Sequence, residues 1–137
     1  MNNKSIHRNV IPATAIAAAG TLTSQIEKAT YGKGLRLFLT VAAATAGGGV
    51  DAVFLCAVPP GTVTPVPLAG FAIANMLSVA GVYIADFYPG AWLPPVLAAG
   101  GALVGAAGIE LPTAWAVQIV MGAGNAATIT VDAEMMP

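Results

Sequence analysis

The sequence is poor in charged residues, histidine and cysteine. Only 8% of its 137 residues are charged, against about 25% in typical globular domains, and 57% are hydrophobic. The single cysteine, Cys56, excludes an intrachain disulfide and is expected to be a small buried side chain. With His7 as the only histidine, the chain has no Ser-His-Asp set or Cys-His cluster, and no glycine-rich phosphate loop leads into a helix. We therefore expect no enzyme and no cofactor.

Basic residues are absent after Arg36. Five basic residues and one acidic residue, Glu27, give the first 36 residues a net charge of +4, whereas the remainder carries five acidic residues and no basic one. Residues 1–30 are expected to form an extended arm that meets an acidic partner surface, or alternatively a solvated terminus. With Tyr31 as the one aromatic residue nearby, these cations are too few for a nucleic-acid groove, so no nucleic-acid partner is expected.

Long uncharged stretches raise the possibility of membrane spans. Residues 52–85, 87–109 and 111–131 carry no charge, and about 20 apolar residues suffice for a helix that crosses a bilayer. A small integral membrane protein of a virion, or a pilin-like helical subunit, is therefore an alternative interpretation. However, Pro59-Pro60 and Pro94-Pro95 interrupt these stretches, and no basic residue follows them to set an orientation. We therefore favour a protein that does not span a membrane.

Alternating side chains indicate β-strands instead. In residues 128–135, Ile and Val alternate with Thr and Asp, and residues 35–41 alternate in the same way. Gly- and Pro-rich turns separate such segments. Eight strands of this kind predict a single all-β domain, a jelly-roll-like β-sandwich over residues 31–137 that follows the extended N-terminal arm. The predicted strands lie near residues 10–17, 35–43, 50–58, 66–74, 81–88, 102–107, 114–121 and 127–135.

Two carboxylates are the one candidate for a metal site. Asp132 and Glu134 share a face of the last predicted strand, which places them about 7 Å apart because a strand rises about 3.3 Å per residue. This spacing suits a pair of calcium ligands, whereas a solvated outer face is the favoured alternative. We therefore predict no metal site.

The end of the chain carries a family resemblance. Leu111-Pro-Thr-Ala-Trp115 leads into an alternating strand, a Gly-containing turn at residues 122–125 and a Thr-rich alternating strand. In this order, and over about residues 21–137, the chain resembles the small jelly-roll proteins encoded beside the major capsid proteins of tailed bacteriophages. Those proteins serve as capsid decoration or cement proteins. Family members usually place Arg or other polar residues along the Trp strand, where Ala116 and Gln118 stand here.

The resemblance implies a structural protein on the outside of an icosahedral bacteriophage capsid, made in the host cytoplasm and located on the virion surface. Its implied partners are the major capsid protein and further copies of itself, as dimers or trimers that hide the apolar outer faces. A phage tail or connector subunit remains a further alternative. The candidate capsid-contact residues are the cations of the arm: Lys4, Arg8, Lys28, Lys33 and Arg36.

Overall fold

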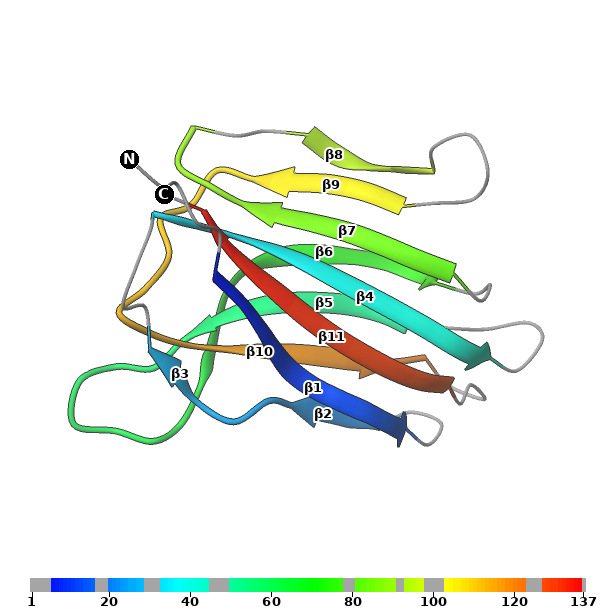
Figure 1. Cartoon of the computed structure of the whole chain (residues 1–137), viewed down its shortest axis with the longest axis horizontal. Coiled ribbons are helices and arrows are strands. Elements are labelled where there is room, and N and C mark those ends of the chain that lie inside the picture. Colours follow the sequence, from blue (N-terminus) through cyan, green and yellow to red (C-terminus); the bar gives the residue numbers. More distant parts are fainter. Residues whose placement is uncertain are drawn as a thin grey trace.

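The structure of the chain is a computed structural model. It describes residues 6–16, 20–28, 33–44, 50–77, 81–90, 93–97, 103–122 and 127–136. All regular elements in this part of the chain are strands (Figure 1). Their bounds are β1 (Ile6–Ile16), β2 (Thr21–Thr23), β3 (Glu27–Lys28), β4 (Gly34–Ala44), β5 (Val50–Ala57), β6 (Val66–Leu77), β7 (Gly81–Phe87), β8 (Leu93–Leu97), β9 (Leu103–Ala107), β10 (Ala114–Met121) and β11 (Ala127–Met136).

The strands form two sheets packed face to face. One sheet has six strands in the order β1-β11-β4-β7-β9-β8, and the other has five, in the order β2-β10-β5-β6 with β3 also paired to β10. The antiparallel pairs are nested along the chain. The innermost pair is β5 with β6, and β4 with β7, β10 with β2 and β3, and β11 with β1 follow outward in that order. Long hairpins wrapped in this way make a jelly roll. The predicted all-β sandwich is confirmed.

Inward-facing side chains from both sheets make one hydrophobic core. In β11 the burial alternates strictly, with apolar residues inside and Thr, Asp and Glu outside. Leu37 of β4 and Val117 and Ile119 of β10 are fully buried. Such alternation is expected when one face of each sheet packs on the other and the second face remains outside. The period-2 pattern predicted for β4, β10 and β11 is therefore confirmed.

The start of the chain differs from the expected arm. Residues 6–16 form β1, which pairs along β11 at the edge of the six-stranded sheet, and residues 21–28 contribute β2 and β3 to the other sheet. The reason is hydrophobic burial, because Val10, Ile11 and Ile16 lie in the core. Register shifts on either side of Ile11, beside Pro12, show that β1 is an irregular edge strand. Lys4 lies outside the described residues.

The insertion between β7 and β10 was predicted in part. The strand expected at residues 102–107 is present as β9, which runs parallel to β7. The strand β8 was not expected, because Pro94-Pro95 indicates a break. However, β8 is the edge strand of the six-stranded sheet, where a missing N–H group need not interrupt the ladder. Within the described residues, no helix is both long and apolar enough to span a membrane.

Candidate interaction surfaces

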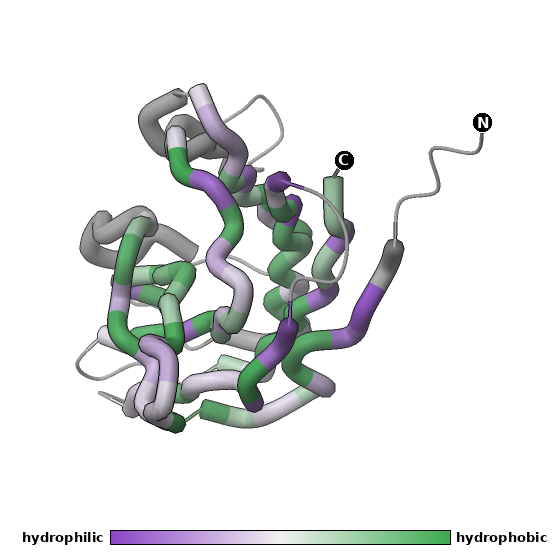
Figure 2. Tube along the Cα trace, turned by 90° about the vertical axis from the view of Figure 1, so that its left-hand side faces the viewer, coloured by the Kyte–Doolittle hydropathy of each residue, from purple (hydrophilic) through white to green (hydrophobic). Residues whose placement is uncertain are grey.

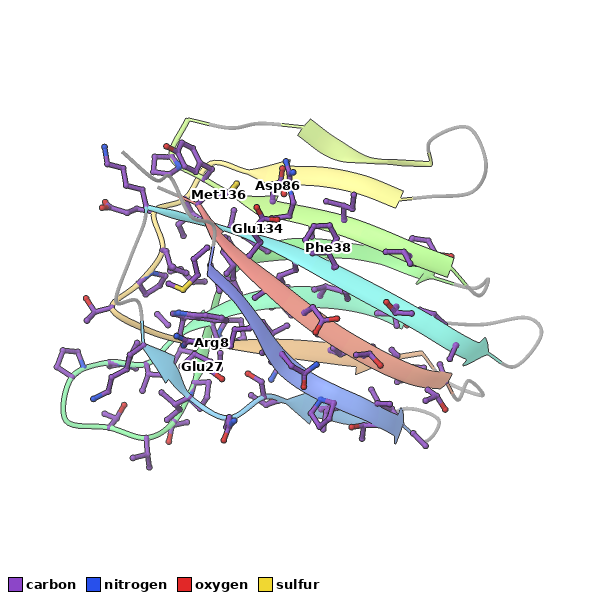
Figure 3. The ribbon with its side chains drawn as sticks, viewed as in Figure 1. Arg8, Glu27, Phe38, Asp86, Glu134 and Met136 are labelled. Atoms are coloured by element: carbon purple, nitrogen blue, oxygen red, sulfur yellow. The ribbon has the colours of Figure 1, made fainter. Side chains whose placement is uncertain are left out.

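In the described part of the chain, the outer face of the six-stranded sheet carries four charged side chains, Arg36, Asp86, Asp132 and Glu134. Arg36 of β4 stands in register with Glu134 of β11 on one side and Asp86 of β7 on the other. Its Nε and Nη2 atoms donate to the two carboxylate oxygens of Asp86 at 2.8 and 2.9 Å. This hydrogen-bonded pairing raises the pKa of Arg36, and burial opposes it only in part. Figure 3 shows Asp86 and Glu134 close together on this face.

The two carboxylates considered for a metal lie on the same outer face. Asp132 accepts a hydrogen bond from the Asn9 amide of β1 at 2.9 Å, and Glu134 is the neighbour of Arg36. Each carboxylate thus has a neighbouring protein group across the strand pair. Among the described residues, no group of three His, Cys, Asp or Glu side chains is placed to hold a metal ion. Phe38 lies in register between Asp132 and Ile84, so apolar side chains also contribute to this face.

The outer face of the five-stranded sheet has no charged side chain at its centre. Val53, Leu55, Val117 and Ile119 point into the core, so the alternate residues of β5 and β10 point outward. Lys28 of β3, in register with Ala114, stands at one end of this face. The six outward residues that define the centre are Ala52, Phe54, Cys56, Ala116, Gln118 and Val120.

On this face an aromatic side chain packs closely beside a glycine of the neighbouring strand. Gly70 of β6 stands in register with Phe54, and a Cβ atom at Gly70 would come within 2.6 Å of the Phe54 ring and would overlap the Val53 carbonyl oxygen. The glycine therefore leaves room for the ring beside the neighbouring strand. Cys56 and Ala116, which stand side by side, are fully buried although they face outward. The same burial raises the pKa of the Cys56 thiol.

An ion pair joins the edges of the two sheets. Arg8 of β1 donates from Nη1 to Oε2 of Glu27 of β3 at 2.8 Å (Figure 3). Arg8 is in register with the inward-facing Ala133, and Glu27 with the inward-facing Trp115, so both long side chains meet between the sheets. The opposite charges of Arg8 and Glu27 therefore neutralise each other where β1 and β3 meet at the edge of the sandwich.

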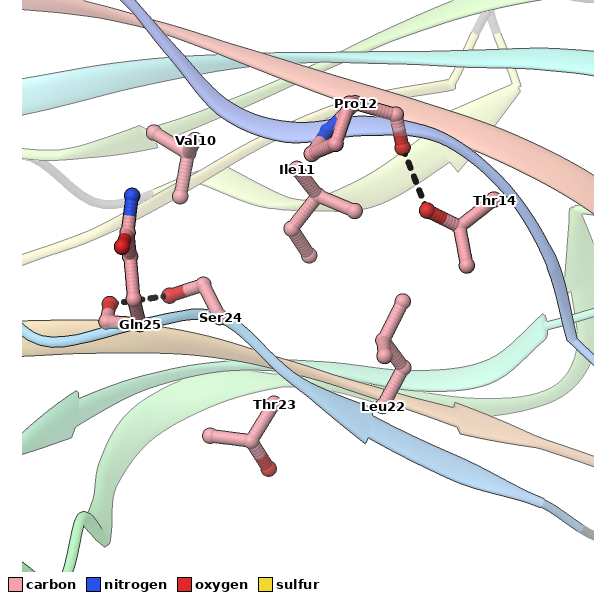
Figure 4. Close-up of a pocket in the computed structure, with 8 residues that line it drawn as sticks. All are labelled: Val10, Ile11, Pro12, Thr14, Leu22, Thr23, Ser24 and Gln25. Atoms are coloured by element: carbon pink, nitrogen blue, oxygen red, sulfur yellow. Dashed lines mark hydrogen bonds between the residues drawn. The ribbon is translucent and has the colours of Figure 1, made fainter.

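Further along the same edge, β1 and β2 border a groove of about 300 Å³ (Figure 4). Its apolar floor comes from Val10, Ile11 and Leu22. Its rim is polar: the Thr14 hydroxyl donates to the Pro12 carbonyl at 2.6 Å, and the Ser24 hydroxyl donates to the Gln25 carbonyl at 2.9 Å. Every lining side chain is uncharged, so the groove offers shape and hydrogen-bonding groups rather than an ionisable catalyst.

The connection from β5 into β6 exposes several apolar side chains. Residues 59–62 form a turn in which Gly61 has a φ of 76°, the Thr62 N–H donates to the Pro59 carbonyl at 3.1 Å and the Thr62 hydroxyl does so at 2.9 Å. Val63 follows with 81% of its surface exposed, and Leu68 in β6 is 49% exposed. Prolines and the closed turn restrict this segment, which lowers the entropy it would lose on binding.

The structure brings most of the candidate capsid-contact cations to one end of the sandwich. Arg36 and Arg8 lie near the starts of β4 and β1 but are engaged by Asp86 and Glu27. Lys28 and Lys33 are exposed at this same end, and Lys33 is tied by its backbone to Met136 and Leu111. We call this region, made of Lys28, Lys33 and residues 58–65, the lysine end. In Figure 2 the lysine end faces the viewer, and purple hydrophilic residues occupy short stretches of a largely pale or green trace.

The residues at positions 59–68 were not singled out by sequence reasoning as a surface. Pro59 and Pro60 were interpreted as turn signals, and Val66 and Leu68 were assigned to the strand predicted near residues 66–74. The sequence signal for an exposed segment was the alternation of Pro with Val in Thr62-Val-Thr-Pro-Val-Pro67. Such prolines are unsuited to a central buried strand.

Comparison with known proteins gives a limited result. No protein-family model matches the chain, and no curated protein matches it in sequence. Among solved structures, a chain in the structure of the Gt strain of infectious bursal disease virus is similar over 98% of this chain, with 11% sequence identity and a TM-score of 0.45. This chain corresponds to 32% of that viral chain's length.

Proposed function

We propose that the protein is a structural component of a bacteriophage virion that binds the outside of the capsid and stabilises it. The observation that carries the proposal is the jelly roll, in which β10 and β11 are the C-terminal strands that give the sequence its resemblance to decoration proteins. Such a role needs a rigid scaffold and contact surfaces. Repetition on a symmetric shell then adds avidity to a weak single contact.

The lysine end is the proposed contact with the shell. Lys28 and Lys33 are exposed and form no ion pair within the described part of the chain, unlike Arg8 and Arg36. Beside them, the restricted segment with Val63 at its tip offers an apolar anchor. An acidic, partly apolar surface of the major capsid protein would complement this combination.

Binding to isolated shells that lack the protein tests this proposal. We compare the wild type with two double variants of equal net charge, Lys28→Gln/Lys33→Gln and Thr40→Glu/Thr128→Glu, the second on the outer face of the six-stranded sheet. We expect the lysine variant to bind about tenfold more weakly by co-sedimentation, and the threonine variant to bind like the wild type. Wild-type binding should also weaken as salt rises, because exposed charges are screened.

Absence of wild-type binding would contradict the decoration role. Equal loss in both double variants would show a general effect of net charge and would contradict the lysine end as the contact. Deletion of residues 1–20 is a less suitable test, because it removes β1 and exposes the edge of β11.

A further inference from the structure

The edge strands of the sandwich differ in how well they are protected against pairing with a further strand. In the described part of the chain, the edges are β1 and β8 in one sheet and β2 and β6 in the other. β1 contains Pro12 and two register shifts, and β8 contains Pro94-Pro95. β6 contains Pro67 and also contacts β9 of the other sheet. Proline and irregular pairing protect an edge because they interrupt the row of hydrogen-bonding groups that a new strand needs.

β2 is the edge that lacks this protection. Thr21–Thr23 contains no proline and no charged residue. The Gly20 carbonyl accepts a hydrogen bond from β10 at 2.9 Å, and the Ser24 N–H donates to β10 at 2.8 Å. Because backbone groups of successive strand residues point in opposite directions, the N–H and C=O groups of Thr21 and Thr23 point away from β10. Among the described residues, no strand pairs with that side of β2.

The groove beside this edge provides space for side chains of an added strand. In Figure 4, Ile11 of β1 and Leu22 of β2 point toward each other across the groove. Leu22 also packs against the core, so the inner side of β2 faces the groove. A strand beside β2 would direct every second side chain to this inner side. The volume of about 300 Å³ and the uncharged lining suit apolar side chains, because a charged group would lose its hydration there without a partner.

Lys28 determines the charge expected at one end of the added strand. It lies in β3, which continues along the same side of β10 as β2. Lys28 is exposed and forms no ion pair within the described part of the chain, whereas its neighbour Glu27 is paired with Arg8. A carboxylate opposite Lys28 would complement its charge. Since β2, β10 and β5 are mutually antiparallel, we expect an antiparallel strand, with the carboxylate at its N-terminal end.

We propose that this side of β2 and β3, which we call the β2 edge, binds an extended segment of a partner protein. The segment adds a strand antiparallel to β2, places apolar side chains in the groove and sets a carboxylate against Lys28. The inference goes beyond capsid binding and is tested without a shell. Its failure and the failure of the decoration role are therefore distinguishable.

Peptide binding to the full chain tests the β2 edge. The probe is acetyl-Glu-Ser-Gly-Ser-Val-Thr-Val-Thr-amide with a fluorescent dye, and anisotropy measures its binding. We expect saturable binding and slower hydrogen exchange at the Thr23 amide. The same peptide with Pro in place of its first Thr should bind at least about tenfold more weakly, because Pro lacks the N–H group that the Thr23 carbonyl would accept.

Variants of the chain test the same contacts from the other side. Thr23→Pro removes an N–H group that does not bond to β10, and should weaken peptide binding at least about tenfold. Thr23→Val keeps this N–H group and should stay within about threefold of the wild type. A peptide with Lys in place of Glu should bind more weakly than the original, and Lys28→Glu should reverse that preference. A β-type circular dichroism spectrum confirms that each variant is folded.

Three results would overturn the proposal. The first is a wild type that does not bind the peptide, or binds the Pro peptide equally well. The second is equal affinity of the wild type for the Glu and Lys peptides, which would contradict the contact with Lys28. The third is a wild type that dimerises without peptide and loses its dimers in Thr23→Pro, because a second copy would then occupy the β2 edge.

Discussion

The two outer faces of the sandwich differ although their inner faces are alike. Inside, both sheets contribute Leu, Val, Ile and aromatic residues to one core. Outside, the six-stranded sheet has the Arg36–Asp86 ion pair flanked by Glu134, whereas the five-stranded sheet has Ala116 and Gln118. Since the inward residues suffice to form the sandwich, the outward residues are free to differ. The six-stranded sheet thus presents a charged outer face and the five-stranded sheet an uncharged one.

The largest expected effect tests whether the inner faces of the two sheets contribute to the core to a similar extent. Leu37 of β4 and Leu55 of β5 are both fully buried, one in each sheet. Each change to Ala should lower the free energy of unfolding by about 2–5 kcal/mol, because it removes buried methyl groups and leaves a cavity. Urea unfolding measures both. A loss below about 1 kcal/mol in one variant alone would contradict a single shared core.

The next effect tests the close approach of Phe54 to Gly70 in the five-stranded sheet. Gly70→Ala should destabilise the protein by about 1–3 kcal/mol, because the new Cβ overlaps the Val53 carbonyl and the Phe54 ring. Gly81→Ala is the control, since a Cβ there has its nearest contact at 3.8 Å, on the Tyr83 ring. That variant should stay within about 0.5 kcal/mol of the wild type in urea unfolding. Equal losses in the two variants would mean that Gly70 is not selected for close packing.

A smaller effect concerns the charged outer face. Asp86→Asn removes the ionic partner of Arg36, whose side chain is 41% exposed, so the loss of stability should be at most about 1 kcal/mol. A double-mutant cycle with Arg36→Gln isolates the pair, and its coupling free energy should decrease in high salt. A coupling that does not change with salt would show that the pair is less solvated than its exposure indicates.

The smallest effect appears only in alkaline solution. Burial raises the pKa of the Cys56 thiol in the folded protein. Its stabilising contribution is therefore fully present below the thiol's pKa in the unfolded chain, about 8.5, and is lost as pH rises toward the folded pKa. The free energy of unfolding should fall with pH above that point more steeply in the wild type than in Cys56→Ala. Parallel pH curves would mean that the thiol ionises equally in both states.

The sequence predicts the strands well where one face is buried. Strict alternation of apolar with polar residues in β4 and β11 allowed both the strand and its inward face to be identified. A strand near residues 10–17 was predicted and is present within β1. Its place in the sandwich was harder to predict, because the basic residues around Val10 suggested an arm and its partner, β11, lies more than 100 residues away. The strand β8 was missed because its two prolines are acceptable only at a sheet edge.

The candidate surfaces were predictable only in part. Ala116 and Gln118 were recognised as an outward face without its usual polar residues, and the structure places Phe54 and Cys56 beside them. The pairing of Arg8 with Glu27 and of Arg36 with Asp86 depends on distant strands and has no local signal. Which cations stay exposed therefore follows from the topology and not from the net charge of the first 36 residues.

The most direct test of the account is the amount of this protein in purified virus particles, measured by quantitative mass spectrometry relative to the major capsid protein. The account predicts many copies in a fixed ratio to the capsid protein, and their removal by mild treatment should leave shells intact. Absence from the particle, or a few copies confined to the tail or connector, would contradict it.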